Sequence, residues 1–354
     1  MENFTYIIKL TTQCNLGCTY CYHFATCSSQ HKDISFDSGA LAYFLRQIAA
    51  ISHNRVVLIW HGGEPLLVSR EMFEVAIETQ KLRSDLKWQN LLQTNATLVN
   101  EEWATLLGKM SFDVGVSIDA PQSIHDAQRV YPSGGGSFDD TVRGIRLLRE
   151  AGLNPGALVT VTRGSFSLAR TTYECLLSLG FDHFDFLPCL NFGDTTLPEG
   201  ISMREFTSFL LEIFRIWAEQ DNPDIHIRKL EDALLGVFGG KPAGCRYRNT
   251  CWQYLTVLPS GDVYPCDKFV GKTEFLYGNV FTDGLARVLK SSGRKNFTAF
   301  LRNSLEACRT CELFQLCKGG CPARRTLVDD YCEAQKHLFT SLQRHYRTLL
   351  EGRH

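Results

Sequence analysis

Three cysteines near the start of the chain, Cys14, Cys18 and Cys21, constrain its fold more than any other feature. Their C-x3-C-x2-C spacing, with Asn15 and Gly17 between them, allows one short loop to hold a single inorganic cluster. Iron–sulfur clusters are bound by Cys thiolates, and a cubane contains four irons. Three local ligands therefore leave one iron open unless a distant Cys fills it. An open iron can bind a substrate or a cofactor, so the loop indicates an enzyme.

A structural zinc site is the alternative for this loop. Zinc takes four ligands and commonly uses closely spaced Cys pairs. His23 or Cys27 would complete such a set with the three cysteines. The loop taken alone leaves this alternative open.

The loop resembles the signature of the radical S-adenosylmethionine (SAM) superfamily, which has the same cysteine spacing and an aromatic residue, here Tyr20, before the last Cys. The resemblance implies that the amino and carboxylate groups of SAM chelate the open iron. Reductive cleavage of SAM then gives a 5′-deoxyadenosyl radical that abstracts a hydrogen atom from the substrate. It also implies an electron donor such as a flavodoxin or a ferredoxin.

Strand and helix patterns alternate after the loop and predict a parallel sheet of six strand–helix units. Strands are predicted at 4–10, 56–60, 88–93, 113–118, 156–162 and 182–187. Helices are predicted at 37–53, 69–83, 100–108, 137–151, 167–179 and 202–220, the first with Asp37 or Ser38 as its cap.

Polar groups follow the predicted strands at the points where they end. In parallel α/β folds the ligand lies at the carboxyl ends of the strands. Those ends carry the Cys loop, Gly62-Gly63-Glu64, Gln93-Thr94-Asn95, Ser117-Ile118-Asp119 and Leu187-Pro188-Cys189. We therefore expect the polar groups and the cluster to converge on one rim.

Radical SAM enzymes are similar in this order, which implies a partial (β/α)6 TIM barrel with the cluster loop after the first strand. In that family the Gly-Gly-Glu-Pro segment binds the SAM amino group, and later strand ends hold the ribose and carboxylate. Glycine allows such a close backbone approach because it lacks a Cβ. Each residue taken singly also fits an ordinary turn or loop. The SAM-binding residues implied are Gly62, Gly63, Glu64, Asn95, Ser117, Asp119 and Arg129.

The strand–helix rhythm stops near residue 221, which predicts a barrel domain at 1–222 and a Cys-rich domain at 223–354. Eight cysteines in the second domain make two complete sets of four. Residues 256–265 have the pattern of a β-hairpin. The eight cysteines are Cys245, Cys251, Cys266, Cys308, Cys311, Cys317, Cys321 and Cys332.

This second domain resembles the SPASM extension of radical SAM enzymes, which has C-x9–15-G-x4-C, then C-x2-C-x5-C-x3-C and a final Cys. The resemblance implies two auxiliary [4Fe-4S] clusters, and so three [4Fe-4S] clusters in all. Fully ligated clusters would transfer electrons, and two zinc ribbons are the alternative. One auxiliary cluster would take Cys245, Cys251, Cys266 and Cys321, and the other Cys308, Cys311, Cys317 and Cys332.

Three clusters imply a net oxidation, which needs a base near the substrate carbon. Asp267 follows Cys266 in a Tyr-Pro-Cys-Asp run that is similar to one in the anaerobic sulfatase maturases. In that family this Asp is the proposed base when a Ser or Cys becomes formylglycine. A loop Asp is otherwise more often a hydrogen-bonding turn residue.

Two positions depart from that family. His61 stands where the maturases have Gln, and His23 where they have Tyr, and both positions face the substrate there. The His-Gly-Gly-Glu-Pro run looks more like SPASM enzymes that crosslink ribosomally made peptides. Many of those carry an N-terminal leader-binding domain. This chain starts on the first predicted strand, so leader binding would need a separate protein or another surface.

The sequence therefore predicts an oxidative radical SAM enzyme acting on a peptide or protein, with peptide crosslinking first and formylglycine formation as the alternative. A small-metabolite substrate is a third possibility, and a zinc-ribbon scaffold is the non-enzymatic one. A formal net charge of −1 does not suggest binding to nucleic acid or an anionic membrane. Neither a signal peptide nor a membrane-spanning run is apparent, so we expect a cytoplasmic protein whose 14 Cys serve mainly as metal ligands.

Overall fold

The computed structural model describes residues 4–21, 34–191 and 197–351. The chain forms two compact units that interleave along the sequence. The first contains Met1–Ser117, Arg129–Pro155 and Cys251–Phe300, and the second contains Ile118–Gln128, Gly156–Thr250 and Leu301–His354. The predicted division into residues 1–222 and 223–354 stays a proposal about how the chain is organised.

A largely parallel sheet forms the centre of the first unit. Its strands, in spatial order, are β10 (Gly278–Asn279), β9 (Asp262–Tyr264), β8 (Tyr254–Val257), β1 (Thr5–Lys9), β2 (Arg55–His61), β3 (Lys87–Thr94) and β4 (Asp113–Ser117). β8, β1, β2, β3 and β4 run parallel to one another, whereas β9 pairs antiparallel with β8, and β10 pairs antiparallel with β9.

The predicted hairpin at 256–265 is confirmed by the antiparallel pairing of β8 with β9. The sequence did not predict that β8 also pairs with β1, in a register that sets Thr256 beside Ile7. This pairing brings the segment after β9 into the same unit as the N-terminal Cys loop.

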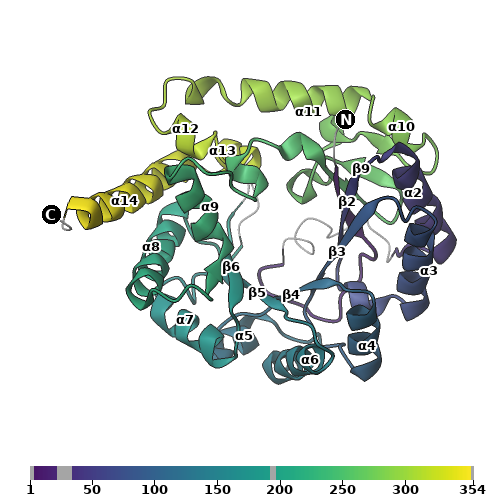
Figure 1. Ribbon diagram of the computed structural model, residues 1–354, viewed down its shortest axis with the longest axis horizontal. Coiled ribbons are helices and arrows are strands. Elements are labelled where there is room, and N and C mark those ends of the chain that lie inside the picture. Colours follow the sequence, from purple (N-terminus) through teal and green to yellow (C-terminus); the bar gives the residue numbers. More distant parts are fainter. Residues whose placement is uncertain (1–3, 22–33, 192–196, 352–354) are drawn as a thin grey trace. The chain divides into compact units, whose positions relative to one another are not determined.

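Helices cover one face of this sheet (Figure 1). α2 and α3 pack against each other, and their rings of Phe44 and Phe73 contact Tyr6 and Trp60 from the strands. α2 begins after Asp37, whose side chain caps Ala40 N–H as predicted. The helices are α2 (Ser38–Ile51), α3 (Arg70–Lys81), α4 (Glu101–Lys109), α6 (Phe138–Glu150), α10 (Leu285–Val288) and α11 (Ser292–Asn303). Short 3-10 turns lie at η1 (Pro65–Leu67), η3 (Cys251–Gln253), η4 (Asp267–Phe269) and η5 (Thr273–Phe275).

The second unit contains three parallel strands, β5 (Gly156–Val161), β6 (His183–Pro188) and β7 (His226–Ile227). Within it α8 packs against α7 and α14, and α9 packs against β6. Its helices are α5 (Gln122–Gln128), α7 (Ala169–Ser178), α8 (Met203–Gln220), α9 (Arg228–Val237), α12 (Phe314–Cys317), α13 (Pro322–Leu327) and α14 (Tyr331–Glu351), with short turns at η2 (Cys245–Tyr247) and η6 (Glu306–Cys308).

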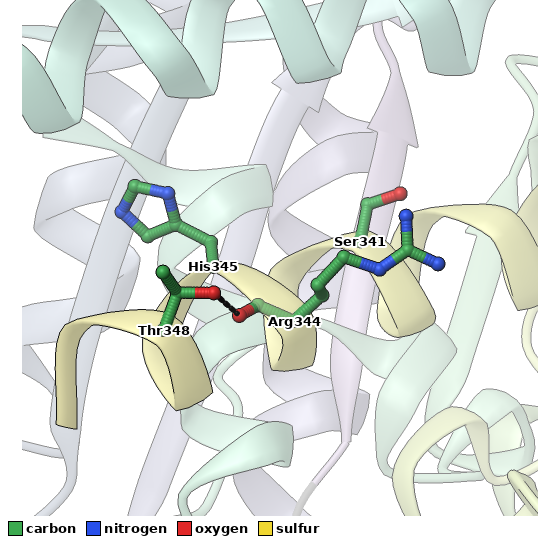
Figure 2. Close-up of a pocket in the computed structure, with 4 residues that line it drawn as sticks. All are labelled: Ser341, Arg344, His345 and Thr348. Carbon is green, nitrogen blue, oxygen red and sulfur yellow. Dashed lines mark hydrogen bonds between the residues drawn. The ribbon is translucent and has the colours of Figure 1, made fainter. Parts of the chain in front are cut away.

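A surface pocket on α14 is lined by Ser341, Arg344, His345 and Thr348 (Figure 2). None of the predicted site residues lines it. Within the ranges that the structure describes, no helix combines the length and apolar character needed to cross a membrane.

Candidate cluster and cofactor site

The Cys loop leaves β1 and is held by the Gly-Gly-Glu segment that leaves β2. The N–H of Gly63 donates to the carbonyl of Thr11, and the N–H of Glu64 donates to that of Gln13, each at 2.8 Å. A Cβ on Gly63 would overlap the carbonyl oxygen of Gln13. Gly62, with φ at +149°, is in a conformation that favours glycine. Both glycines are therefore required by the close approach of two backbones, whatever else they bind.

Glu64 is almost fully buried and ties three strand-end groups together. Its carboxylate accepts hydrogen bonds from the hydroxyl of Thr94 (2.7 Å) and the N–H groups of Asn95 (2.8 Å) and Leu66 (3.0 Å). Burial raises the pKa of Glu64, and these hydrogen bonds oppose that rise. The side chain thus joins the end of β3 to the segment after β2.

Asn95 and Arg129 both contact the Cys loop. The amide N of Asn95 lies 4.0 Å from Cys14 Sγ and donates to Asn15 Oδ1 at 2.9 Å. Arg129 donates to the hydroxyl of Tyr20 at 2.7 Å. Two predicted residues from distant parts of the sequence therefore meet at this loop, as the expected convergence on one rim requires.

Burial raises the pKa of the Cys14 thiol to about 12 in the chain without a metal. A bound cluster reverses this preference because a metal ion stabilises the thiolate. The N–H of Leu16, 3.5 Å from Cys14 Sγ, is a hydrogen-bond donor that suits a ligating sulfur.

The two remaining predicted SAM residues, Ser117 and Asp119, lie at or just after the end of one strand, β4. Ser117, at the end of β4, accepts a hydrogen bond from Gln93 Nε2 at 2.8 Å. Asp119 belongs to the second unit, where its buried carboxylate accepts from Thr160 N–H at 2.9 Å. His23 and Cys27 lie outside the residues that the structure describes.

Lys9 is a site residue that the sequence reasoning missed. Its ammonium lies 2.8 Å and 2.9 Å from the two carboxylate oxygens of Asp267 and 3.3 Å from Nδ1 of His61. The Lys9 side chain is only 4% exposed. The sequence carried one signal of this role, a lysine at the end of an apolar strand, because such a lysine is rarely buried unless it is paired.

Four cysteines of the second unit influence one another electrostatically, as ligands of a shared cluster would. Burial raises the pKa of Cys317 to about 12, and the charges of Cys308 and Cys332 raise it further. Cys308 and Cys311 act on Cys332 in the same direction. These are the four cysteines assigned by resemblance to one auxiliary cluster. Within the described ranges, no three His, Cys, Asp or Glu side chains are grouped as a single metal ion needs.

The cysteines predicted for the other auxiliary cluster are divided between the two units. Cys251 and Cys266 lie in the first unit, where both act on the hydroxyl of Tyr277, and Cys245 and Cys321 lie in the second. That ligand set stays a prediction.

Three cations of the second unit influence one another, and two of them are influenced by Cys245 or Cys321. Arg246 is influenced by the charge of Cys245, and Arg324 by that of Cys321. Lys229 is 2% exposed, and among the described residues its ammonium has no hydrogen-bond partner.

The Asp185 carboxylate lies beside Lys229. Its Oδ1 lies 3.7 Å from Lys229 Nζ, and its Oδ2 accepts from Arg228 at 2.9 Å. Although burial opposes ionisation, the charges of Lys229 and Arg228 hold the pKa of Asp185 at about 2. The surplus positive charge is costly without an anion. A cluster bound by thiolates is an anion, so the donors and charges here fit an iron–sulfur cluster.

Two family models match the chain. The radical SAM superfamily model matches residues 8–164, and the SPASM model, described as an iron-sulfur cluster-binding domain, matches residues 245–312. The chain is 28% identical over 347 residues to the cysteine-type anaerobic sulfatase-maturating enzyme of Clostridium perfringens, covering 92% of each chain. It is also 28% identical over 334 residues to the serine-type enzyme of Bacteroides thetaiotaomicron, covering 88% of this chain and 80% of that one.

Solved structures agree with these matches. Native anSMEcpe with bound AdoMet (SAM) superposes with a TM-score of 0.88 at 27% identity, over 99% of this chain and 100% of that one. Streptococcus suis SuiB bound to SAM has a TM-score of 0.68 at 16% identity, over 94% and 77%, which shows a shared fold only. The iron–sulfur prediction for both cysteine groups is thereby confirmed over the zinc alternative. This chain belongs to the radical SAM superfamily, and it is an enzyme that uses SAM, a [4Fe-4S] cluster and the further iron–sulfur clusters of a C-terminal SPASM domain.

Proposed function

We propose that this enzyme oxidises a cysteine or serine side chain of a peptide or protein to formylglycine. One observation carries the proposal: the Asp267 carboxylate is held by Lys9 beside His61. Its similarity to relatives named anaerobic sulfatase-maturating enzymes supports the reaction. A structure titled as anSMEcpe with AdoMet and the Cp18Cys peptide, at a TM-score of 0.87 and 27% identity, supports a peptide substrate.

When bound, SAM and the iron–sulfur clusters supply the removal of one hydrogen atom and one electron from the substrate carbon. The chain itself must then accept the proton of the neighbouring thiol or hydroxyl, so that the carbon–sulfur or carbon–oxygen single bond becomes a double bond. Asp267 is suited to that proton transfer because its side chain is one-fifth exposed and lies next to Cys266. For serine the product is the aldehyde directly, and for cysteine water replaces sulfur and releases sulfide.

Peptide crosslinking is the second candidate. The observation that favours it is His61, at the position where the maturases have Gln. None of the comparisons supports crosslinking in particular, since SuiB shares the fold alone. Formylglycine formation adds an aldehyde to the peptide and crosslinking does not, so analysis of the product separates the two reactions.

Replacing Asp267 with Asn tests the base. We expect D267N to retain its iron and to cleave SAM, but to form product at least about 100-fold more slowly, the usual size of a general-base effect. The assay is anaerobic, with a sulfatase-derived peptide carrying one Cys or one Ser, and counts 5′-deoxyadenosine and peptide product by mass spectrometry. Capture by a hydrazide identifies the aldehyde, whereas a crosslinked peptide has no new carbonyl.

Glu71→Gln, an exposed carboxylate change on α3, is the matched control and should be indistinguishable from wild type. Product formation by D267N at the wild-type rate would remove Asp267 as the base. A wild-type enzyme that cleaves SAM yet leaves both peptides unchanged would remove formylglycine formation.

We also propose an external flavodoxin or ferredoxin donor, a cytoplasmic location, the two auxiliary ligand sets and a SAM site built from the Gly-Gly-Glu segment and later strand ends. A separate leader-binding protein is required only if crosslinking is the reaction.

A further inference from the structure

We infer that Lys9 is a positioning residue that holds the Asp267 carboxylate and selects the tautomer of His61, so that His61 faces the substrate as a hydrogen-bond donor. The inference deepens the proposed function and rests on it for the substrate. The contacts of Lys9 and His61 carry it independently of any reaction.

Strand geometry places the two residues together. β1 and β2 are parallel neighbours, and Lys9 is the register partner of His61. Side chains alternate between the faces of a strand, and Tyr6 and Trp60 point toward α2 and α3. Lys9 and His61, an odd number of residues away from those two, therefore share the opposite face. Asp267 reaches the same face from the turn after β9.

Lys9 satisfies two groups with one ammonium. Its ammonium donates a hydrogen bond to Oδ2 of Asp267 at 2.9 Å, and it also lies 2.8 Å from Oδ1 of Asp267 and 3.3 Å from Nδ1 of His61. Contact with both carboxylate oxygens fixes the rotation of the carboxylate as well as its position. Since the ammonium is almost fully buried, this arrangement has little room to rotate.

The same contacts decide which nitrogen of His61 carries hydrogen. Nδ1 lies 2.8 Å from the backbone N–H of Gly62 and 3.3 Å from the Lys9 ammonium, and both of these are donors. The carbonyl of Gly62 also lies 3.2 Å from Nδ1, but an Nδ1–H would still face two donors. Nδ1 is therefore the acceptor, and the hydrogen of the neutral ring is on Nε2.

This assignment makes His61 a donor in place of a base. A site with a fixed acceptor, Asp267, beside a fixed donor, His61, suits a peptide residue whose side-chain thiol or hydroxyl donates and whose carbonyl accepts. Glutamine offers an N–H of the same kind, which explains how a histidine can stand at a position where the maturases have Gln. If Lys9 had only a structural role, it would anchor the turn that carries Asp267, and its replacement would not change the tautomer of His61.

Four variants test the inference in the cluster-loaded enzyme. Lys9→Met keeps the length of the side chain but not its charge, and His61→Gln keeps a donor that His61→Leu removes. We expect K9M and H61L to cleave SAM but to lose about tenfold or more of their product per 5′-deoxyadenosine, while H61Q stays within a few-fold of wild type. Lys87→Met, an exposed lysine at the start of β3, is the control.

Nitrogen-15 NMR of histidine-labelled enzyme reads the tautomer without substrate, with H61Q identifying the signal. Wild type should show hydrogen on Nε2, and K9M should show a mixture. If K9M leaves an unpaired carboxylate and fails to fold, the uncharged double variant K9M/D267N gives the same spectral test. Hydrogen on Nδ1 in wild type, or a tautomer that neither variant changes, would overturn the inference. Wild type without product but with the Nε2 tautomer would contradict the proposed function alone.

Discussion

At the scale of single residues, Glu64 was predicted to bind a ligand, but its carboxylate is used in hydrogen bonds within the protein. Its carboxylate accepts from Thr94, Asn95 and Leu66, and it is 1% exposed. We therefore expect the Gly-Gly-Glu segment to bind SAM through backbone groups in preference to this carboxylate. A carboxylate suits the position because all three partners are donors.

Replacing Glu64 with Gln should lower the free energy of unfolding by about 1–3 kcal/mol, because an amide N–H would face one of two backbone donors, Leu66 or Asn95. The cost should depend on pH. Burial raises the folded-state pKa of Glu64, so the folded chain binds its proton more tightly than the unfolded chain does. The stabilisation by Glu64 is then complete below the unfolded pKa, about 4.3, and is lost as pH rises through the folded value.

Anaerobic denaturant titrations of the cluster-loaded wild type and E64Q, at several pH values above about 4.3, check this prediction. The difference between the two proteins should shrink as the pH rises. A difference that grows with pH would mean that the hydrogen bonds outweigh burial and lower the pKa of Glu64.

At the scale of elements, the segments that follow β1 and β2 approach each other so closely that a side chain at Gly62 or Gly63 would overlap the backbone of the Cys loop. The Cys loop docks on Gly63 and Glu64 through main-chain hydrogen bonds. On the other side of β1, β8 adds a parallel strand from late in the sequence. β1 is therefore the strand that holds the Cys loop and, through Lys9, the turn that carries Asp267.

Gly63→Ala should displace the Cys loop, because the added Cβ meets the carbonyl of Gln13, which is backbone and cannot move aside alone. We expect a loss of up to about four irons per chain, the content of one cubane, and loss of SAM cleavage. Iron analysis and 5′-deoxyadenosine assays measure both. Gly135→Ala, where a Cβ meets nothing within 4 Å, is the control. Full iron content in G63A would show that the loop adapts to the extra methyl group.

At the scale of the whole molecule, charge ties folding to cofactor binding. The formal net charge is only −1, yet the second unit buries Lys229, 3.7 Å from Asp185, and also buries Arg324, which is influenced by the charge of Cys321. Such buried positive charge is unfavourable in the metal-free chain, and we expect an anionic cluster to offset it. The protein is thus built for its loaded state.

Lys229→Met should change the thermal unfolding midpoint in opposite directions in the metal-free and the cluster-loaded protein. In the metal-free protein the change removes an unfavourable buried charge and should raise the unfolding midpoint by a few degrees, about 2–4 °C per kcal/mol for a domain of this size. In the loaded protein it removes an attraction and should lower the midpoint. Thermal scans of both forms measure this, with the exposed Lys241→Met as control. A shift of the same sign in both forms would show that Lys229 does not interact with the cluster.

The sequence by itself determined the parts of this protein that depend on spacing along the chain. The cysteine intervals predicted the iron–sulfur clusters, the strand–helix alternation predicted the parallel sheet, and 256–265 predicted a hairpin. Local spacing is sufficient for these because neighbouring residues supply the ligands, the turns and the apolar faces.

Tertiary structure alone decided which side chains meet across the fold. Lys9 and Asp267 are 258 positions apart, and they meet because β1 turns Lys9 toward the face that the turn after β9 also reaches. The pairing of β8 with β1, the contacts of Glu64 and the cations beside Cys245 and Cys321 are of the same kind. No interval in the sequence encodes such contacts, since they depend on strand register, side-chain direction and burial.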